Sequence, residues 1–500
     1  MVMNYDMKRF ISLALATSAL ITCAHSIAES PEPELLNNAD GQSNQWNGVG
    51  QIHRNGSRYC TAFLLDTRDS NNEANGPAYI ATNAHCASIK TGTTTNKNYQ
   101  GEMQFNYFAD TLDPTKRYAI KKVSWASLAS ADTAIMELDT SLNALLQEGI
   151  TPLKLASSAP ANPTQVKVIG APSVASGLRL STCTQEPSNI VLIKYMTVHT
   201  NYQKQDCKGI APGSSGSPVI DAATGEVTGV LSGTTYGLSD DKLCFWHGLC
   251  GENKTGSSLP DRASHSFPMD YLTACFTEGR FDIDASTCTL KPEFSFNSTI
   301  DSDVTLHKKP MNDNEETPSW GTEFTMSTAF YRYKTVRDAH ACHLPENYSD
   351  IISTHSAKVA APIGREEGLY YLCLVGVDTA EQPFTTGLLR NAQILPARIV
   401  EPVSTPLPDL TPPAIRTLPI GLLLSFSAVD GRNAWVQVYT GPPETTDCGA
   451  INLNEYENLK HGFLILNRYL PRTVCSYAMD RNFSTSHVRT DLVQHSENGE

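Results

Sequence analysis

The cysteines constrain this 500-residue chain more than any other feature of its sequence. There are 13, and the first, Cys23, lies close to the amino terminus. Setting Cys23 aside leaves 13 − 1 = 12, an even number that suits disulfides in an oxidising compartment. The spacing groups these cysteines into sequential couples: Cys60/Cys86, Cys183/Cys207, Cys244/Cys250, Cys275/Cys288, Cys342/Cys373 and Cys448/Cys475.

The first 28 residues have the features of an export signal. Two basic residues precede the apolar run 10–21, and small residues at 26–28 offer a cleavage site. The run is too short to span a bilayer, and no later stretch approaches about 18 apolar residues, so we expect no transmembrane segment. A threonine before Cys23 disfavours lipid anchoring there. We therefore expect a secreted or periplasmic protein, with 29–45 as a propeptide or linker.

Residues 46–288 alternate short β-type runs with polar turns. A chain of this length exceeds one compact core, and its 29 prolines and 32 glycines favour short strands over long helices. Strands at this spacing are typical of barrels or sandwiches. We expect a mostly β domain with one helix at 268–276. The expected strands include 59–65, 78–82, 103–108, 132–138, 166–169, 190–195 and 227–231.

Two stretches after Cys288 resemble one another. Each begins with an aromatic run, continues into a cysteine couple, and has an aspartate five positions after the second cysteine. We expect two disulfide-stapled β-sandwiches, at 289–400 and 414–500, joined by a proline-rich linker at 401–413. They look like the immunoglobulin-like or fibronectin-like modules of many secreted enzymes, and such modules would bind a surface or substrate.

Charge and histidine placement bear on the possible partners. The formal net charge of −14 is spread along the chain without a basic stripe, so we expect no nucleic-acid partner. The sequence has no Cys-x-x-Cys pair and no His-Glu-x-x-His segment, and we expect no metal site. His53, His199, His247 and His265 are scattered, and surface or loop positions explain them better than metal binding.

Three separated segments resemble the chymotrypsin-like serine protease family. They are Ala-Thr-Asn-Ala-His-Cys at 81–86, Ala-Asp-Thr-Ala-Ile-Met-Glu-Leu at 131–138 and Gly-Ser-Ser-Gly-Ser-Pro at 213–218. The order His, Asp, Ser matches this family. The resemblance implies an all-β fold of two six-stranded barrels and a serine endopeptidase that needs no cofactor. It also implies a disulfide between Cys60 and Cys86.

The chemistry of peptide hydrolysis requires these residue types. A serine hydroxyl is a poor nucleophile at neutral pH, so a base must accept its proton during attack. The resemblance makes Ser215 the nucleophile, His85 the general base and Asp132 the carboxylate that orients the imidazole. In the family, the amides at the positions of Gly213 and Ser215 bind the oxyanion. Glycine at 213 and 216 lets the backbone turn sharply around Ser215.

Two departures from the family pattern concern activation and specificity. Ser214 stands where digestive and clotting members have an aspartate that pairs with a new amino terminus, and the usual Ile-Val-Gly-Gly start is missing. The nucleophile loop is more similar to that of bacterial glutamyl endopeptidases. Residues 227–233 look like the strand that lines the primary pocket, so Leu231, Ser232 and Gly233 are expected to contact substrate. The sequence assigns no cleavage preference.

Three functions are compatible with these residues. The first is a secreted endopeptidase that cleaves protein or peptide substrates through an acyl-enzyme. The second is a non-catalytic adhesion or binding protein built on a protease scaffold. The third keeps the triad but hydrolyses esters.

Overall fold

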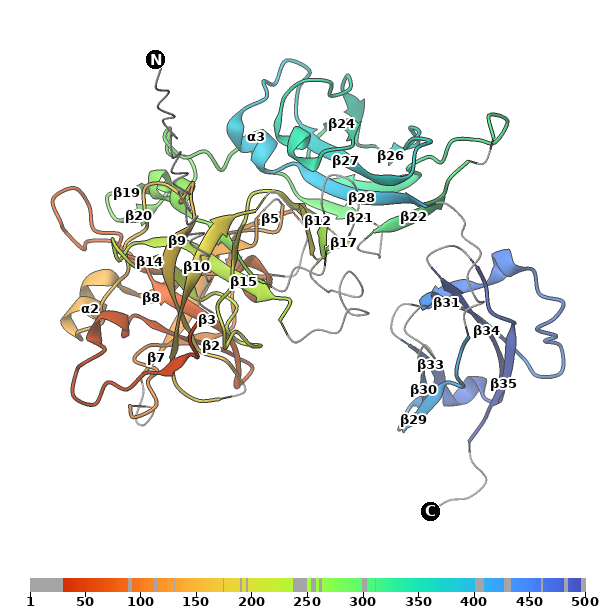
Figure 1. Ribbon diagram of the computed structural model, residues 1–500, viewed down its shortest axis with the longest axis horizontal. Helices are drawn as coiled ribbons and strands as arrows, with labels where there is room; N and C mark the ends of the chain where they lie inside the picture. Colours follow the sequence, from red (N-terminus) through yellow and green to blue (C-terminus); the bar gives the residue numbers. More distant parts are fainter. Residues whose placement is uncertain are drawn as a thin grey trace, which may run out of the picture.

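The computed structural model describes most of the chain. The described ranges are 30–88, 92–111, 116–129, 131–173, 175–188, 191–194, 197–236, 250–252, 258–259, 263–298, 304–310, 312–355, 357–400, 409–426, 433–459, 462–480 and 484–495. The predicted export signal and Cys23 lie outside them. The protein is mostly β, with two closed six-stranded antiparallel barrels followed by smaller sheets, as predicted (Figure 1).

The first barrel closes because β7 pairs with both β6 and β8. An additional strand, β5 (Thr93–Asn98), pairs with β7 outside the ring. The core of the first barrel contains aliphatic side chains such as Ile52, Ile80 and Met136, all fully buried. The ring strands are β2 (Val49–Arg54), β3 (Ser57–Leu64), β4 (Pro77–Thr82), β8 (Thr133–Ser141), β7 (Arg117–Ser127) and β6 (Glu102–Gln104).

The second barrel closes through the pairing of β9 with β10. A large apolar cluster joins the two barrels, with Phe63 and Trp125 from the first barrel and Ile220 and Phe267 from the second. The ring strands are β9 (Thr164–Gly170), β10 (Arg179–Pro187), β13 (Gln203–Gln205), β18 (Ser264–Pro268), β15 (Val227–Thr234) and β14 (Pro218–Asp221).

Residues 30–45, which the sequence leaves as a propeptide or linker, pack on the barrels. Strand β1 (Glu34–Leu35) pairs with β10, and Leu36 lies in the cluster between the barrels. The backbone amide of Asn38 donates to a carboxylate oxygen of Asp110 at 2.8 Å. These contacts anchor the segment to both barrels.

Two segments differ from the predicted secondary structure. The expected strand at 103–108 ends at Gln104, and Asn106 then adopts a positive φ of 52°, which a continuing strand does not allow. The expected helix at 268–276 is a 3-10 helix, η3 (Asp270–Cys275). The Cys275–Cys288 disulfide ties its end to the chain that leaves the barrels.

A small sheet extends from the second barrel toward the carboxyl-terminal units. It contains β12 (Thr197–His199), β11 (Val191–Lys194), β16 (Cys250–Glu252) and β17 (Ser258–Leu259). Strands β11 and β12 form an antiparallel pair, hereafter the β11–β12 hairpin.

The unit at 289–400, hereafter the first module, is a sandwich of two sheets. Its core joins aromatic residues such as Phe296 and Phe324 of one sheet to Leu372 and Ile399 of the other. The smaller sheet contains β21 (Phe296–Ser298), β23 (Thr322–Met326) and β26 (Lys358–Val359). The larger contains β22 (Thr305–Lys308), β28 (Gln393–Val400), β27 (Gly368–Val377), β24 (Phe330–Val336) and β25 (Ile352–Ser353), with β22 parallel to β28.

The unit at 414–500, hereafter the second module, repeats this plan with fewer strands. Leu422 and Leu424 of one sheet pack with Val438 and Val474 of the other. One sheet contains β29 (Ala414–Leu418), β30 (Gly421–Ser425) and β33 (Phe463–Leu466). The other contains β32 (Glu457–Leu459), β31 (Asn433–Gly441), β34 (Arg472–Asp480) and β35 (Arg489–Val493).

Five of the expected cysteine couples are bonded. They are Cys60–Cys86, Cys183–Cys207, Cys275–Cys288, Cys342–Cys373 and Cys448–Cys475. Cys244, the expected partner of Cys250, lies outside the described residues. Several disulfides in one chain indicate an extracytoplasmic protein. Among the described residues, no helix has both the length and the apolar character needed to cross a membrane.

Candidate active site

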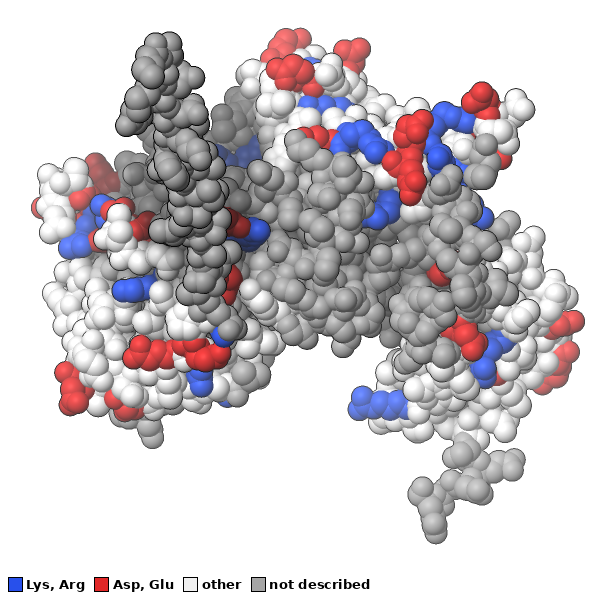
Figure 2. Space-filling model, viewed as in Figure 1, with Lys and Arg blue, Asp and Glu red and all other residues white. Residues whose placement is uncertain are grey.

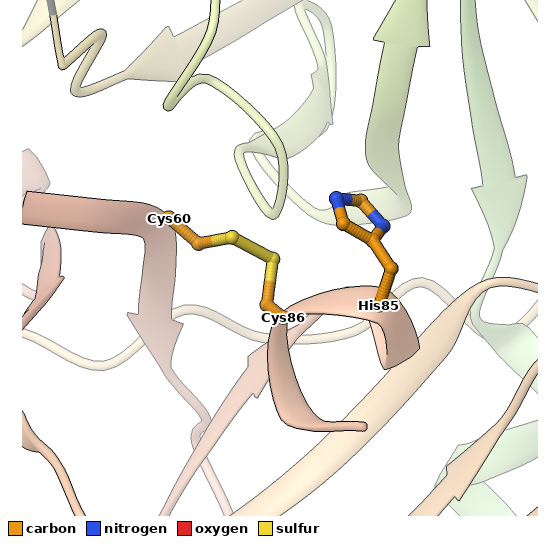
Figure 3. A group of neighbouring side chains, drawn as sticks. All are labelled: Cys60, His85 and Cys86. Atoms are coloured by element: carbon orange, nitrogen blue, oxygen red, sulfur yellow. A yellow bond between two sulfur atoms is a disulfide. The ribbon is translucent and has the colours of Figure 1, made fainter. Parts of the chain in front are cut away.

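His85 lies on a single helical turn, α1 (Ala84–Ala87), directly after β4. The next residue, Cys86, is bonded to Cys60 on β3, so the disulfide holds this turn against the strand, with the imidazole projecting beside it (Figure 3). The Tyr99 hydroxyl donates to the carbonyl oxygen of Cys86 at 3.1 Å. Burial raises the pKa of Tyr99 to about 12, so this hydroxyl remains a donor at neutral pH.

Asp132 is fully buried just before β8 and faces His85. One carboxylate oxygen, Oδ2, lies 2.8 Å from Nδ1 of His85, and the other, Oδ1, accepts the backbone amide of His85 at 3.0 Å. The side chain of Asn83 donates to the Asp132 carbonyl at 2.7 Å. A carboxylate accepts but does not donate, so Nδ1 carries the proton and Nε2 is left as the basic nitrogen of the neutral ring.

Ser215 sits in the tight loop that precedes β14. The glycines on either side of the serine pair have positive φ, 95° at Gly213 and 91° at Gly216. A Cβ at Gly216 would lie 2.0 Å from the carbonyl oxygen of Thr61, and one at Gly213 would lie 2.3 Å from the amide of Ser173. Both positions therefore require glycine, for conformation and for space.

Ser232 connects the nucleophile to the carboxylate. The hydroxyl of Ser215 donates to the carbonyl oxygen of Ser232 at 3.2 Å, and the hydroxyl of Ser232 donates to Oδ2 of Asp132 at 2.7 Å. Hydrogen bonds therefore run from Ser215 through Ser232 and Asp132 to His85. Three segments that are far apart in the sequence meet at this point between the barrels.

The amides expected to bind an oxyanion belong to a well-fixed loop. Neither the amide of Gly213 nor that of Ser215 donates to an acceptor within the described part of the chain. The carbonyl oxygens of the same loop are held, since Pro212 O accepts from the amide of Ser173 at 2.8 Å and Ser215 O from the amide of Thr61 at 2.8 Å. The two amides are therefore left for a ligand.

Ser214, which replaces the family aspartate, is held by short-range contacts. Its side chain is buried and accepts from the amide of Ala211 at 3.3 Å, and its carbonyl accepts from the hydroxyl of Ser217 at 2.6 Å. A Cβ at Gly170 would lie 3.4 Å from the Ser214 hydroxyl, which shows how closely the second barrel encloses it. Neutral hydrogen bonds thus hold Ser214 at the position where the aspartate of digestive and clotting proteases was expected to be missing.

The three expected pocket residues lie on β15 but differ in exposure. Leu231 is fully buried in the core of the second barrel beside Val168 and Val219. Gly233 is partly exposed and pairs with His265 on β18. Ser232 is buried and makes the two contacts already described. Of these residues, Gly233 offers surface to a ligand and Leu231 supports the strand from behind.

The expectation of surface or loop positions for the scattered histidines was wrong for three of them. His53, His199 and His265 are buried on β2, β12 and β18. His199 packs edge-on against Phe267 with ring centroids 5.0 Å apart, and His265 packs in the same way against Tyr202 at 5.3 Å. A neutral imidazole can take an aromatic place in a core, which local sequence polarity does not reveal. His247 lies outside the described residues.

One group of residues places possible metal ligands close together. Ligand atoms of Cys60, His85 and Cys86 all lie within 4.8 Å of one another. Both sulfur atoms belong to one disulfide, so neither is a thiolate that could bind a metal (Figure 3). The group does not fit a metal site.

On the surface, acidic and basic residues are interspersed on the face seen in Figure 2.

Sequence reasoning did not single out several residues that support the loops. The hydroxyls of Thr61 and Ser173 donate to carbonyls of the loop that carries Ser215. The Asn83 side chain donates to the Asp132 carbonyl, and the Thr82 hydroxyl donates to the Thr61 carbonyl. Thr82 and Asn83 lie inside the histidine motif and could have been considered. Thr61 and Ser173 carry no local signal, because the carbonyl groups that their hydroxyls bind are more than thirty residues away in the sequence.

Comparison with known proteins gives one family match. Residues 60–230 match the model of the trypsin-like peptidase domain, and the match includes His85, Asp132 and Ser215. Similar solved structures include a thermostable serine protease, AL20, from an extremophilic microorganism, with 14% identity and a TM-score of 0.31 over 49% of this chain and 99% of that chain. Kallikrein-related peptidase 10 has 14% identity and a TM-score of 0.30 over 45% and 92%. No curated protein matches the chain.

Proposed function

We propose that the chain is a secreted serine endopeptidase that hydrolyses peptide bonds through an acyl-enzyme, with Ser215 as nucleophile, His85 as general base and Asp132 as orienting acid. The observation that carries the proposal is the buried Asp132 carboxylate, which binds Nδ1 of His85 and, through Ser232, is linked to the Ser215 hydroxyl. The trypsin-like peptidase match over residues 60–230 supports the same reaction class.

The reaction begins when the Ser215 hydroxyl attacks the substrate carbonyl carbon. A rotation about χ1 of Ser215 turns the hydroxyl from the Ser232 carbonyl toward Nε2 of His85, which accepts the proton. The oxygen of the tetrahedral intermediate is stabilised by the amides of Gly213 and Ser215. His85 then gives the proton to the leaving amine, and a water molecule repeats the sequence on the acyl-enzyme.

Asp132 is suited to support the imidazolium that forms in this step. Its side chain is fully buried, while that of His85 is 12% exposed, so the carboxylate acts on the ring without competition from water. Loss of an equivalent carboxylate costs about 10⁴-fold in turnover in the reference system for this chemistry. We expect Asp132→Asn to show a loss of that order.

A fluorophosphonate probe tests the proposal directly. The purified mature protein should be labelled at Ser215, and Ser215→Ala should remove the label. Hydrolysis of casein together with a simple ester supports an endopeptidase, and ester hydrolysis alone supports an esterase. An unlabelled, folded protein that still binds cells would indicate a binding protein on a protease scaffold.

Secretion and the roles of the modules belong to the same proposal. The disulfides and the expected export signal support an extracellular or periplasmic enzyme. We infer that the two modules, which look like immunoglobulin-like or fibronectin-like units, serve to hold the enzyme at a surface or substrate. Fractionation of the source cells, followed by immunodetection, tests the location.

A further inference from the structure

Thr61 joins the first barrel to the nucleophile loop through its side chain. It lies on β3, is fully buried, and directly follows the disulfide-bonded Cys60. Its hydroxyl donates to the carbonyl oxygen of Gly213 at 2.8 Å and accepts from the backbone amide of Ala171 at 2.9 Å. One hydroxyl therefore bridges the nucleophile loop and the segment that follows β9.

The backbone of Thr61 holds the same loop from a second direction. Its amide donates to the carbonyl oxygen of Ser215 at 2.8 Å. Its own carbonyl accepts from the Thr82 hydroxyl at 2.8 Å, which ties β3 to β4 just before His85. The backbone bond would survive a change of side chain, whereas the hydroxyl bridge to Gly213 depends on the residue type.

The bridge from Thr61 restricts the backbone conformation at Gly213. The φ of 95° at this glycine belongs to a region that glycine enters freely, so the glycine itself does not fix the orientation of the adjoining peptides. The preceding peptide is held by the Ser173 amide and hydroxyl, which both donate to the carbonyl oxygen of Pro212, at 2.8 and 2.9 Å. The following peptide is held by the Thr61 hydroxyl at the carbonyl oxygen of Gly213, and by the Ser214 amide, which donates to the carbonyl oxygen of Ala211 at 2.9 Å.

We propose that Thr61 is a positioning residue that sets the two oxyanion-binding amides, those of Gly213 and Ser215, relative to each other. The inference rests on the proposed peptidase function. Because a peptide unit is planar and trans, the Pro212 carbonyl fixes the direction of the Gly213 N–H, and the Gly213 carbonyl fixes the peptide that lies between this amide and that of Ser215. Release of the Gly213 carbonyl leaves this middle peptide held only by the bond from the Ser214 amide to the Ala211 carbonyl, so it can rotate and the two amides then converge less well on the substrate oxyanion.

A hydroxyl is the group that this position requires. It donates one hydrogen bond and accepts another, which valine of the same shape cannot do and serine can. Valine would leave the Ala171 amide and the Gly213 carbonyl without their partner in a buried place. The Gly213 carbonyl would then seek another donor, and movement of the loop is the available response.

The test compares Thr61→Val, Thr61→Ser and the unaltered protein in peptide hydrolysis. Outright loss of an oxyanion donor lowers kcat by about 10²–10³-fold, so we expect a smaller loss of about 10- to 100-fold for Thr61→Val. KM should change little, because the amide acts mainly in the transition state. Binding of a peptide boronate, which mimics the tetrahedral intermediate, should weaken by a factor similar to the loss in kcat. Thr61→Ser should recover most of both.

A matched control separates positioning from general stability. Thr228 is also a buried threonine on a barrel strand, and its hydroxyl donates to the Val219 carbonyl at 3.2 Å, away from the loop. Thr228→Val should lower the melting temperature as Thr61→Val does, yet leave kcat and boronate affinity unchanged. If Thr61→Val does not fold, Thr61→Cys replaces it, because a thiol is a weak donor and should give an intermediate kcat.

Two results overturn the inference, and they differ from failure of the proposed function. A folded Thr61→Val or Thr61→Cys protein with unaltered kcat and boronate affinity shows that the hydroxyl has no positioning role. Equal losses in Thr61→Ser and Thr61→Val show that any change at this position disturbs the loop, and that retaining the hydroxyl does not preserve the amide positions. If the unaltered protein neither hydrolyses peptides nor reacts with the fluorophosphonate, the peptidase proposal itself fails, and the positioning role fails with it.

Discussion

The first and second modules each bury both faces of their larger sheet, but they cover the outer face differently. In the first module, alternate residues of β27 point either into the sandwich, as Leu372 does, or to the outer face, as Tyr371 and Cys373 do. The outer-face cluster also contains Val191 and Val198 of the β11–β12 hairpin. The two-barrel domain, through this hairpin, therefore completes the core of the first module.

In the second module, the corresponding outer face is covered by the module's own chain. Cys475 and Tyr477 of β34 pack against Cys448 and Tyr456, which belong to the segment between β31 and β32. Both described apolar clusters of this module draw all of their members from residues 422–493. The comparison indicates that the second module is a self-contained unit, while the first is an extension of the two-barrel domain.

Polar contacts at the start of the first module strengthen its attachment. The hydroxyl of Thr93 on β5 donates to the carbonyl of Phe294, and that of Thr95 to the carboxylate of Glu293 at 3.1 Å. Burial raises the pKa of Glu293, and the Thr95 hydroxyl is a smaller opposing effect. The first module is thus contacted by the first barrel as well as by the hairpin that extends from the second barrel.

Truncation at two points should give the largest difference between the modules. A chain that ends at residue 400 should keep its peptidase activity and the melting temperature of its barrels. A chain that ends at residue 288 exposes Val191 and Val198, and full exposure of two such side chains costs about 3–6 kcal/mol of stability. Calorimetry and casein hydrolysis measure both effects. Equal melting temperatures for the two truncated chains would show that the first module is merely tethered.

Removal of the disulfides should give the next largest contrast. Loss of Cys342–Cys373 through paired alanine substitutions should cost about 2–5 kcal/mol, and should also destabilise the barrels, because both cysteines lie in the shared cluster. Loss of Cys448–Cys475 should cost a similar amount but affect the second module alone. Hydrogen exchange read separately on barrel and module peptides distinguishes the two. Unchanged exchange in the barrels after the first substitution contradicts the shared core.

The docking of the first module could not be predicted from the sequence, although its fold could. The aromatic run and the cysteine couple of each stretch are local signals, and the small sheets that follow the barrels confirm the β structure predicted there. The partners of the outer face, Val191 and Val198, lie more than a hundred residues before Cys342 and have no distinctive pattern of their own. Strands β27 and β34 are both buried almost throughout, so the two sequences do not reveal which sheet borders another domain.

The same reasoning explains which parts of the candidate site could be predicted. Each of the three candidate catalytic residues, His85, Asp132 and Ser215, lies in a short motif of neighbouring residues. The sequence alone therefore predicts them as one set. The supporting contact from Thr61 to Gly213 spans 152 positions and depends on how the barrels meet. The sequence also could not show that the Leu231 side chain lies in the core, because both faces of β15 are buried over 227–232.

A histidine at the docked interface makes the attachment sensitive to pH. His343, on the 3-10 helix η4 (Ala339–His343), lies with Nδ1 3.1 Å from the Leu389 carbonyl and Nε2 2.8 Å from the Thr200 hydroxyl. A carbonyl can only accept, so Nδ1 carries the proton and neutral Nε2 accepts from Thr200. Burial lowers the pKa of His343 against a smaller opposing effect of the Leu389 carbonyl.

The lowered pKa of His343 predicts a loss of stability in acid. Nearby His340, Arg390 and Lys334 lower the pKa further. In the unfolded chain this histidine titrates near pH 6.5, so below that pH the unfolded state binds a proton that the folded state resists. The contribution is complete above about pH 6.5 and is lost as the pH falls, by about 1.4 kcal/mol per pH unit at most.

Thermal unfolding of His343→Gln between pH 7.5 and 5 measures this contribution. The variant should lose part of the pH dependence of the transition that contains the barrels and the first module. The transition of the second module should keep the same pH dependence in both proteins, since His343 lies in the first module. Identical pH profiles of the first transition in the two proteins would show that His343 is not the sensitive group.

The smallest predicted contrast concerns one arginine in each module. Arg390 lies with its guanidinium 4.3 Å from the ring centroid of Tyr271 in η3, and it donates to the carbonyl and hydroxyl oxygens of Thr289. Arg390→Ala should cost about 1 kcal/mol, since a partly buried cation–π contact contributes about 0.5–2 kcal/mol. Arg472 lies 5.6 Å from the ring of Tyr469, which is 47% exposed, so Arg472→Ala should cost less than about 0.5 kcal/mol. If Arg390→Ala and Arg472→Ala lower the melting temperatures of their own transitions equally, the contact between Arg390 and Tyr271 contributes no more than an ordinary surface contact.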